Sequence, residues 1–313
     1  MISCTEFIPA YSELFSFLDD RYGRDEVSRL WDFLFKPDGK GIPLINFVKK
    51  EGIRGCFSYW SGTLTEEASD CDLYLNEKAG WYLSTMHHCP SKGRLLELKD
   101  ELGITPYKDY CLHCGYYDSA LRAAGLVRYK VYPKADSASC SSLIFDPKVF
   151  KGSIIFDENT ESLEVKAGEH EYFHPDFHSS MNMGLLYVGE THGEEAVKDY
   201  LRRYTENVYV KVIADARKHG LDAIRDKIRD TYRLERSEDA LNIEKDDDTM
   251  TVTIAYCPAV RHLRKTGRRV CEWFSLSTET VMETLANKAE LDFAMLSYDN
   301  ETGAAKYTFK KRG

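Results

Sequence analysis

The sequence predicts an α+β protein made of two tandem copies of one domain, each copy an antiparallel sheet covered by helices on one face. Three observations lead to this. Segments with apolar residues at helical spacing alternate with short hairpin-like runs. The same order of elements occurs in both halves of the chain. Characteristic residues also recur at a nearly constant separation, which indicates an internal duplication.

The repeat is clearest at glycines and at Cys-Pro pairs. The interval from Gly52 to Gly220 equals the interval from Cys89 to Cys257, and each of these cysteines precedes a proline. Two further pairs have nearly the same interval: Gly23 with Gly193, and Phe145 with Phe309. The two halves therefore align almost without insertions.

The repeat sets the expected domain boundaries. We expect a Cys-rich first copy over 1–148, a linking hairpin over 149–168 and a second copy over 169–313. The two copies should pack about a pseudo-two-fold axis, as the subunits of a homodimer would.

Within the first copy, amphipathic spacing predicts the helices, and glycine or proline ends them. The expected helices are Ile8 to Arg21, Asp25 to Phe35, Leu44 to Glu51, Cys56 to Thr65, Arg94 to Leu102 and Tyr110 to Ala124. The expected strands are Asp72 to Tyr74, Trp81 to Met86, Val127 to Tyr132 and Ser141 to Phe145, followed by Phe150 to Phe156 and Glu161 to Val165 as the linking hairpin.

Composition and charge narrow the class of function. The 313 residues are 30% charged and 43% hydrophobic, which is typical of a globular protein. The formal net charge of −9 argues against nucleic acid as a partner. The start of the chain lacks a signal peptide, and no apolar run is long enough to span a membrane. We expect a cytoplasmic protein, monomeric as a pseudo-dimer or homodimeric, that binds a small-molecule substrate.

Nine cysteines, an odd number, suggest thiols or metal ligands rather than a disulfide framework. The first copy carries Cys89, the pair Cys111 and Cys114, and Cys140, whereas the second copy keeps only Cys257 at the matching positions. A Cys-x-x-Cys on a helix places two sulfurs on one face. With the other two cysteines at strand ends, the four can converge on a tetrahedral zinc site, with an iron–sulfur cluster or no metal as the alternatives.

The remaining cysteines and the neighbouring histidines have simpler interpretations. Cys111 or Cys114, at a helix N-terminal turn, can instead be an activated thiolate. Spare nitrogen ligands nearby are His87, His88 and His113. Four cysteines are expected to be buried as small hydrophobic residues: Cys4, Cys56, Cys71 and Cys271.

The stretch from Glu169 to Asn182 is the second candidate site. Because His174 precedes Pro175, a helix is expected to begin at Pro175, with His174 as its N-cap. His178 and Asn182 then share one face of that helix. His174 or His178 with Glu171 can form a general acid–base pair, with Asn182 beside it, or a second metal site. Otherwise His174 only caps the helix, and the other side chains face solvent. Pro175 excludes an HExxH zinc motif.

The chain resembles the L-2-amino-thiazoline-4-carboxylic acid hydrolase-like family. The resemblance rests on Gly193 to Val197, on Cys257-Pro258 followed by Leu263 to Gly267, and on the closing hairpin Tyr298 to Phe309. The stretch His174 to His178 followed by Asn182 is also similar to uncharacterised proteins of anaerobes grouped with that family. The resemblance covers the second half and extends more loosely to the first.

The resemblance implies hydrolytic opening of a cyclic amidine-type thiazoline. The family's cysteine pattern is similar to Cys89, Cys111 or Cys114, and Cys140. The layout also resembles four-vinyl-reductase-type ligand-binding domains, some of which hold zinc through cysteines and act as small-molecule sensors. The sequence therefore predicts a metal-binding hydrolase of a small cyclic C–N substrate. The alternative is a non-catalytic small-molecule-binding module with a structural zinc site.

Overall fold

The structure, a computed structural model, describes residues 1–38 and 41–312 and is an α+β fold. Its α-helices are α1 (Phe7–Tyr22), α2 (Arg24–Leu34), α3 (Leu44–Glu51), α4 (Ile53–Glu66), α5 (Pro90–Leu102), α6 (Asp118–Ala123), α7 (Phe177–His192), α8 (Glu194–Val208), α9 (Val210–His219), α10 (Leu221–Leu234), α11 (Pro258–Lys265) and α12 (Leu276–Lys288). Its strands are β1 (Asp70–Asn76), β2 (Trp81–His88), β3 (Val127–Val131), β4 (Cys140–Phe145), β5 (Glu161–Val165), β6 (Leu241–Lys245), β7 (Thr249–Ile254), β8 (Leu291–Tyr298) and β9 (Ala305–Lys311).

The chain divides into two compact units. Unit 1 contains residues 1–21, 102–104 and 175–313, and unit 2 contains residues 22–101 and 105–174. The first helix, α1, therefore belongs to the same unit as the C-terminal half of the chain. Within unit 1 the α1 backbone is tied to that half, because the Tyr200 hydroxyl donates a 2.8 Å hydrogen bond to the carbonyl oxygen of Ala10.

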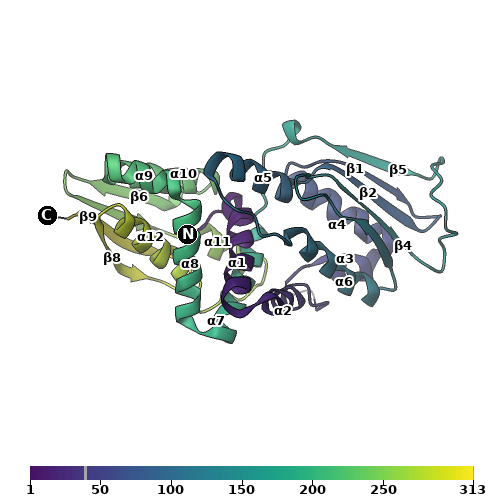
Figure 1. The fold of residues 1–313 in the computed structure, drawn as a ribbon, viewed down its shortest axis with the longest axis horizontal. Helices are drawn as coiled ribbons and strands as arrows, with labels where there is room; N and C mark the ends of the chain where they lie inside the picture. The colour runs from purple at the N-terminus through teal and green to yellow at the C-terminus, as the bar shows by residue number, and fades with distance from the viewer. Residues whose placement is uncertain (39–40, 313) are drawn as a thin grey trace. The chain divides into compact units, whose positions relative to one another are not determined.

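Unit 2 is built on a five-stranded antiparallel sheet in the order β3-β4-β2-β1-β5. Helices α3, α4 and α6 lie along one face of it (Figure 1). Alternate side chains of the strands point to that face, as the two-residue period of a strand requires. Leu73, Leu75 and Tyr82 pack there with Leu44 and Cys56 from the helices. This apolar layer is the core of unit 2.

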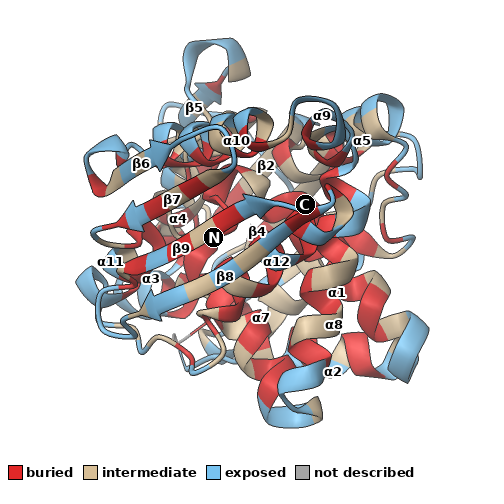
Figure 2. Cartoon of the chain, turned by 90° about the vertical axis from the view of Figure 1, so that its left-hand side faces the viewer, coloured by how far each residue is buried: buried red, intermediate tan, exposed pale blue. Residues whose placement is uncertain are grey.

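Unit 1 holds a four-stranded antiparallel sheet in the order β6-β7-β9-β8. Helix α12 packs along β8, and α10 contacts β6 and β9. Buried and exposed residues alternate along these strands (Figure 2), so one face of the sheet meets the helices and the other meets solvent. The predicted α+β class, with helices covering an antiparallel sheet, is confirmed. The pseudo-two-fold relation between copies stays a prediction.

The helix that follows Pro175 begins later than expected. It starts at Phe177, and Asp176 rather than His174 occupies the N-cap position. The reason is a turn, in which the backbone N–H of His178 donates to the carbonyl oxygen of Pro175 at 3.1 Å. The Asp176 side chain makes no cap hydrogen bond to the backbone, and its carboxylate instead accepts one from the Ser179 hydroxyl at 2.9 Å.

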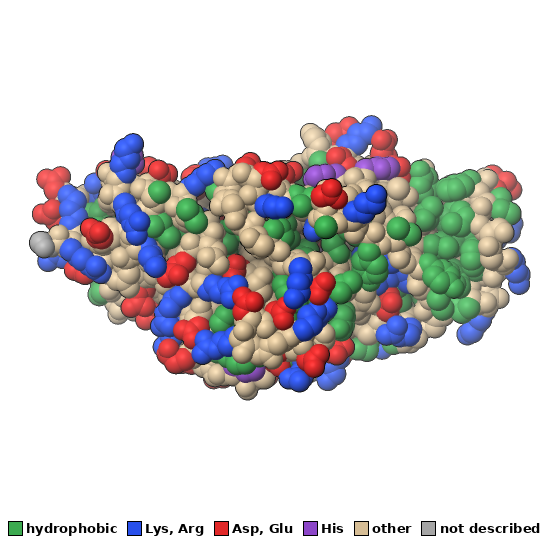
Figure 3. Space-filling view, in the orientation of Figure 1, with side chains coloured by type: hydrophobic (Ala, Val, Ile, Leu, Met, Phe, Trp, Pro, Cys, Tyr) green, Lys and Arg blue, Asp and Glu red, His purple; other side chains and the backbone are tan. Residues whose placement is uncertain are grey.

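The predicted strand over Phe150 to Phe156 is wrong, because the described chain has no strand there. Only Glu161–Val165 forms one, and it pairs with β1 as the edge of the unit 2 sheet. The ring of Phe156 instead packs against those of Tyr74 and Trp81, with centroids 5.1 and 5.5 Å away. This segment therefore packs an apolar side chain against β1 and β2 instead of forming a strand that pairs with them. Figure 3 shows hydrophobic side chains gathered over this part of unit 2.

Among the residues that the structure describes, no helix has both the length and the apolar character needed to cross a bilayer.

Candidate functional site

Three potential metal ligands meet in the interior of unit 1. The ligand atoms of Cys4, His178 and Glu235 all lie within 4.8 Å of one another. The three residues are 0%, 3% and 5% exposed. They come from the N-terminal segment, the first turn of α7 and the residue after α10. In the described part of the chain, residues 1–38 and 41–312, this is the one group of three His, Cys, Asp or Glu side chains that can hold a metal ion.

The N-terminal segment is held against α10 by polar contacts. The backbone N–H of Cys4 donates to Glu235 Oε1 at 2.6 Å. Two residues further on, Glu6 forms an ion pair with Lys227 of α10, with 2.6 Å between Glu6 Oε1 and Lys227 Nζ. Both ends of the short 3-10 helix Cys4–Glu6 are therefore fixed, and the Cys4 thiol is placed beside Glu235.

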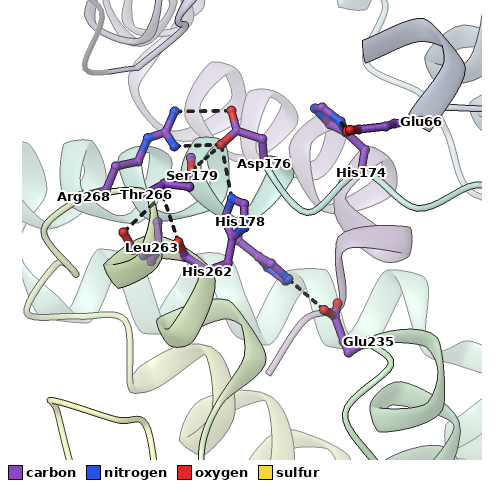
Figure 4. A network of polar contacts seen from close by, with 10 residues as sticks. All are labelled: Glu66, His174, Asp176, His178, Ser179, Glu235, His262, Leu263, Thr266 and Arg268. Atoms are coloured by element: carbon purple, nitrogen blue, oxygen red, sulfur yellow. Dashed lines mark hydrogen bonds and ion pairs between the residues drawn. The ribbon is translucent and has the colours of Figure 1, made fainter. Parts of the chain in front are cut away.

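His178 supplies the second contact to Glu235. The distance between His178 Nε2 and Glu235 Oε2 is 3.0 Å, and Figure 4 shows the imidazole pointing at the carboxylate. A carboxylate can only accept, so Nε2 carries the hydrogen in this contact. Burial raises the pKa of Glu235, but the charge of His178 and hydrogen bonds from His178 and Cys4 outweigh it, and the pKa is lowered. Glu235 is therefore an anion in the interior.

A second, half-buried polar cluster surrounds Asp176 at the start of α7. Its carboxylate lies 2.8 Å from Arg268 Nη1 and 3.3 Å from His262 Nε2. Figure 4 shows Asp176 between these two side chains. The rings of His178 and His262 have centroids 6.4 Å apart. Two histidine–carboxylate pairs thus lie next to each other in unit 1, one enclosed and one with 21% and 28% side-chain exposure for His262 and Asp176.

The buried group suits a borderline-soft metal ion. Cysteine sulfur, imidazole nitrogen and carboxylate oxygen are the ligand types that zinc takes in proteins, at about 2.3, 2.0 and 2.0 Å. At those bond lengths neighbouring ligand atoms of a tetrahedral site lie roughly 3.3–3.6 Å apart. The 3.0 Å between His178 and Glu235 is close to that range. The donor types and this distance are therefore compatible with a bound metal ion.

The predicted acid–base residues are divided between the two units. His174 and Glu171 belong to unit 2, and His178 and Asn182 belong to unit 1. Both histidines are buried, at 8% and 3% exposure, whereas Glu171 is exposed. The carboxylates beside the histidines are Glu66, 2.6 Å from His174 Nδ1, and Glu235. A catalytic role for these residues stays a prediction.

Asn182 makes two hydrogen bonds to the backbone. Its Nδ2 donates to the carbonyl oxygen of Arg269 at 3.1 Å, and its Oδ1 accepts from the N–H of Cys271 at 2.8 Å. Asn182 is 2% exposed. These contacts fix the segment that follows α11 and carries Arg268, so Asn182 acts on the Asp176 cluster through the backbone.

The four cysteines predicted to bind zinc lie in unit 2. Burial is the largest cause that raises the pKa values of the other three, Cys89, Cys111 and Cys140. The charge of Cys114 is among the further causes that raise them. They are not part of the one three-ligand group found among the described residues. The four-cysteine site stays a prediction.

The sequence interpretation assigned Cys4 only to the buried hydrophobic cysteines and did not single out Glu235. Cys4, Cys56, Cys71 and Cys271 are buried as expected. The overlooked signal was the repeat, because Cys4 lies as far before His174 as Gly23 lies before Gly193. Each of the two therefore stands at the same place before the first helix of its half.

Known proteins offer no further guide to this site. No protein-family model, no curated protein and no solved structure matches the chain.

Proposed function

We propose that this chain is a metal-binding protein whose ion is zinc, held by Cys4, His178 and Glu235. One observation carries the proposal: ligand atoms from three distant segments come within 4.8 Å of one another in the interior of one unit. Buried charged groups are costly unless they are paired or coordinate a metal. The mixed sulfur, nitrogen and oxygen donors favour zinc over an iron–sulfur cluster, which is held mainly by thiolates.

The activity we propose for this centre is hydrolysis of a small cyclic C–N substrate of the amidine or thiazoline type. Three protein ligands is the number typical of catalytic zinc sites, whereas structural sites usually have four. A bound zinc ion supplies Lewis-acid activation of water. His262 pairs with Asp176 at 3.3 Å, is partly exposed and has its ring 6.4 Å from that of His178, so it is a group beside the centre that can move a proton. Arg268 offers a positive charge beside it for a substrate carboxylate.

A non-catalytic small-molecule-binding module is the second candidate. An open, mostly apolar hollow of about 540 Å³ on unit 2 favours it. Its volume lies in the range of small-molecule sites. Its lining residues are Tyr129, Leu143, Phe145, Pro147, Phe150, Gly152 and Ile154. In that case the zinc ion would be structural, and ligand binding would not depend on His262.

We also propose that the two halves arose by tandem duplication, with copies related by a pseudo-two-fold axis. Backbone angles support the duplication. Gly52 and Gly220 have φ/ψ of 59/−134° and 60/−132°. Gly23 and Gly193 have 91/164° and 85/171°. The same unusual conformations therefore recur at the separations expected from the sequence.

Metal analysis tests the zinc proposal. Full-length protein equilibrated with zinc and dialysed should retain one ion per chain, and cobalt in its place should give a sulfur-to-metal charge-transfer band. Cys4→Ser and His178→Ala should lose the ion. Cys56→Ser, which changes a buried cysteine of unit 2, is the matched control and should keep it. Retention of the ion by Cys4→Ser and its loss in Cys114→Ser would assign the metal to the four predicted cysteines instead.

The hydrolase proposal has a separate test. Zinc-loaded protein is incubated with a panel of cyclic amidines and thiazoline carboxylates, and ring opening is followed by mass spectrometry. Turnover should fall by about 10²–10⁴ in His262→Ala, the usual contribution of a general acid–base group. This activity would be refuted if His262→Ala turned over the substrate as fast as wild type, or if the zinc-loaded protein showed no turnover. Neither result would contradict the proposed metal site.

A further inference from the structure

Unit 2 contains a cluster of reactive groups outside the metal centre, on the 3-10 helix Tyr110–Tyr117. The Sγ atom of Cys114 lies 3.6 Å from Nε2 of its neighbour His113. The other ring nitrogen of His113, Nδ1, contacts the carbonyl oxygen of Tyr110. A nucleophile, a base and a group that orients the base are the parts of an activated nucleophile.

The Tyr110 carbonyl settles which nitrogen of His113 can act as the base. A carbonyl oxygen only accepts, so the hydrogen of the neutral imidazole lies on Nδ1. Nε2 is then the unprotonated nitrogen, and it faces the thiol of Cys114. The contact thus has the direction needed to take the thiol proton.

Two basic side chains of strand β3 complete the surroundings. Arg128 and Lys130 are two residues apart and point to the same face of the strand. Arg128 Nη2 donates to the carbonyl oxygen of Cys114 at 2.6 Å and is also held by Asp118. The Lys130 ammonium is close enough to Cys114 for each group to shift the pKa of the other, raising that of Lys130 and lowering that of Cys114. Lys130 therefore places a positive charge that favours the thiolate form of Cys114, the form that attacks.

The cluster is accessible and differs from the other thiols. Cys114 and His113 are half-buried, and Leu112 beside them is 39% exposed. Burial raises the Cys114 pKa, but His113, which becomes positive when it takes the thiol proton, and the charges of Lys130 and Arg128 outweigh it, and the pKa falls well below the ordinary thiol value. For Cys111, earlier in the same 3-10 helix, burial raises the pKa to about 11, because the positive charges near it offset burial only partly.

We propose that Cys114 and His113 form a nucleophile–base pair that accepts an acyl group from a small activated acyl compound. The sulfur of Cys114 forms a bond to the acyl carbon, and the bond from that carbon to the leaving atom breaks. The thiol proton moves to His113 Nε2 and then to the leaving group. The product is a thioester on Cys114. This site shares no residue with the zinc centre and does not depend on it.

The first test maps thiol reactivity on the full chain. Limiting iodoacetamide is added at pH 6–7, and the alkylated cysteines are identified by peptide mass spectrometry. Cys114 should react on the order of tenfold faster than Cys111 in the same molecules, because the thiolate is the reacting form. His113→Gln should raise the pH at which the Cys114 rate reaches half its maximum. Leu112→Ala, an exposed change in the same 3-10 helix, should leave that pH profile unchanged.

The second test uses 4-nitrophenyl acetate as the acyl probe. Wild-type protein should release one equivalent of 4-nitrophenolate in a rapid burst and gain one acetyl group on Cys114. Cys114→Ala should lose the burst, and circular dichroism should show that it is folded. A burst that persists in Cys114→Ala overturns the proposal. Alkylation of Cys114 that is no faster than that of Cys111 also overturns the proposal. This outcome includes the case in which a metal ion held by the four cysteines protects Cys114 from alkylation.

Discussion

Two glutamates at corresponding places in the chain have opposite environments. Glu67 and Glu235 are separated by the same interval as Gly52 and Gly220, and each is the C-cap residue of the helix before a hairpin, α4 or α10. Their φ/ψ angles are −84/2° and −83/2°. Each precedes a non-glycine residue in the left-handed region, Ala68 with φ 48° or Arg236 with φ 52°. The backbone therefore treats the two glutamates alike.

The charged groups around the two glutamates, in contrast, differ. Glu235 faces His178 and Cys4, which lower its pKa in spite of burial. For Glu67, burial raises the pKa to about 7, because His174 and His113 offset it only partly and Cys114 opposes them. The comparison shows that one backbone position yields an anion in unit 1 and a carboxyl group that titrates near neutrality in unit 2. The residues around the carboxylate, not its place in the fold, decide its chemistry.

Removing the partner of Glu235 should give the largest effect. His178→Ala leaves a buried carboxylate without its imidazole partner, and breaking a buried pair in this way costs roughly 3–5 kcal/mol. Metal-free protein is compared by urea unfolding at pH 7. The matched change is His174→Ala, whose partner Glu66 has a side chain that is 53% exposed, so the loss of that pair should cost about 1 kcal/mol or less. Equal losses in the two variants would contradict the contrast between the units.

Glu67→Gln should have a smaller effect that depends on pH. A carboxyl group whose pKa is higher in the folded than in the unfolded protein stabilises the fold at low pH, and that contribution is lost as pH rises through about 7. The amide has no such dependence. Because Glu67 is only half-buried, we expect Glu67→Gln to be more stable than wild type by about 1–2 kcal/mol at pH 8 and nearly equal to it at pH 4.5. Unfolding curves at both pH values measure this, and a gain of the same size at both would refute the role of charge.

The sequence predicted well those features of the fold, such as helix bounds, that depend on residues close together in the chain. Leu44 to Glu51 was expected and found as a helix with the same bounds, because its apolar spacing and the glycine after it act within a few residues. The contacts of Glu235 come from Cys4, 231 residues away, and from His178, 57 residues away. Periodicity carries no information about such partners. The one long-range signal in the sequence was the internal repeat, which relates Cys4 to His174 and Glu67 to Glu235.

The smallest difference that we predict, between Gly52→Ala and Gly220→Ala, tests whether the two backbones are equivalent. Gly52 and Gly220 have positive φ with ψ of −134° and −132°, a conformation that side chains rarely adopt, and an added Cβ would meet no atom within 4 Å at either position. The cost of Gly52→Ala and Gly220→Ala is therefore conformational alone, about 1–2 kcal/mol in each case. Urea unfolding should give the same loss for both within about 0.5 kcal/mol. A clear difference would mean that the units hold this turn with different rigidity, and that charge partners are not the only way in which they have diverged.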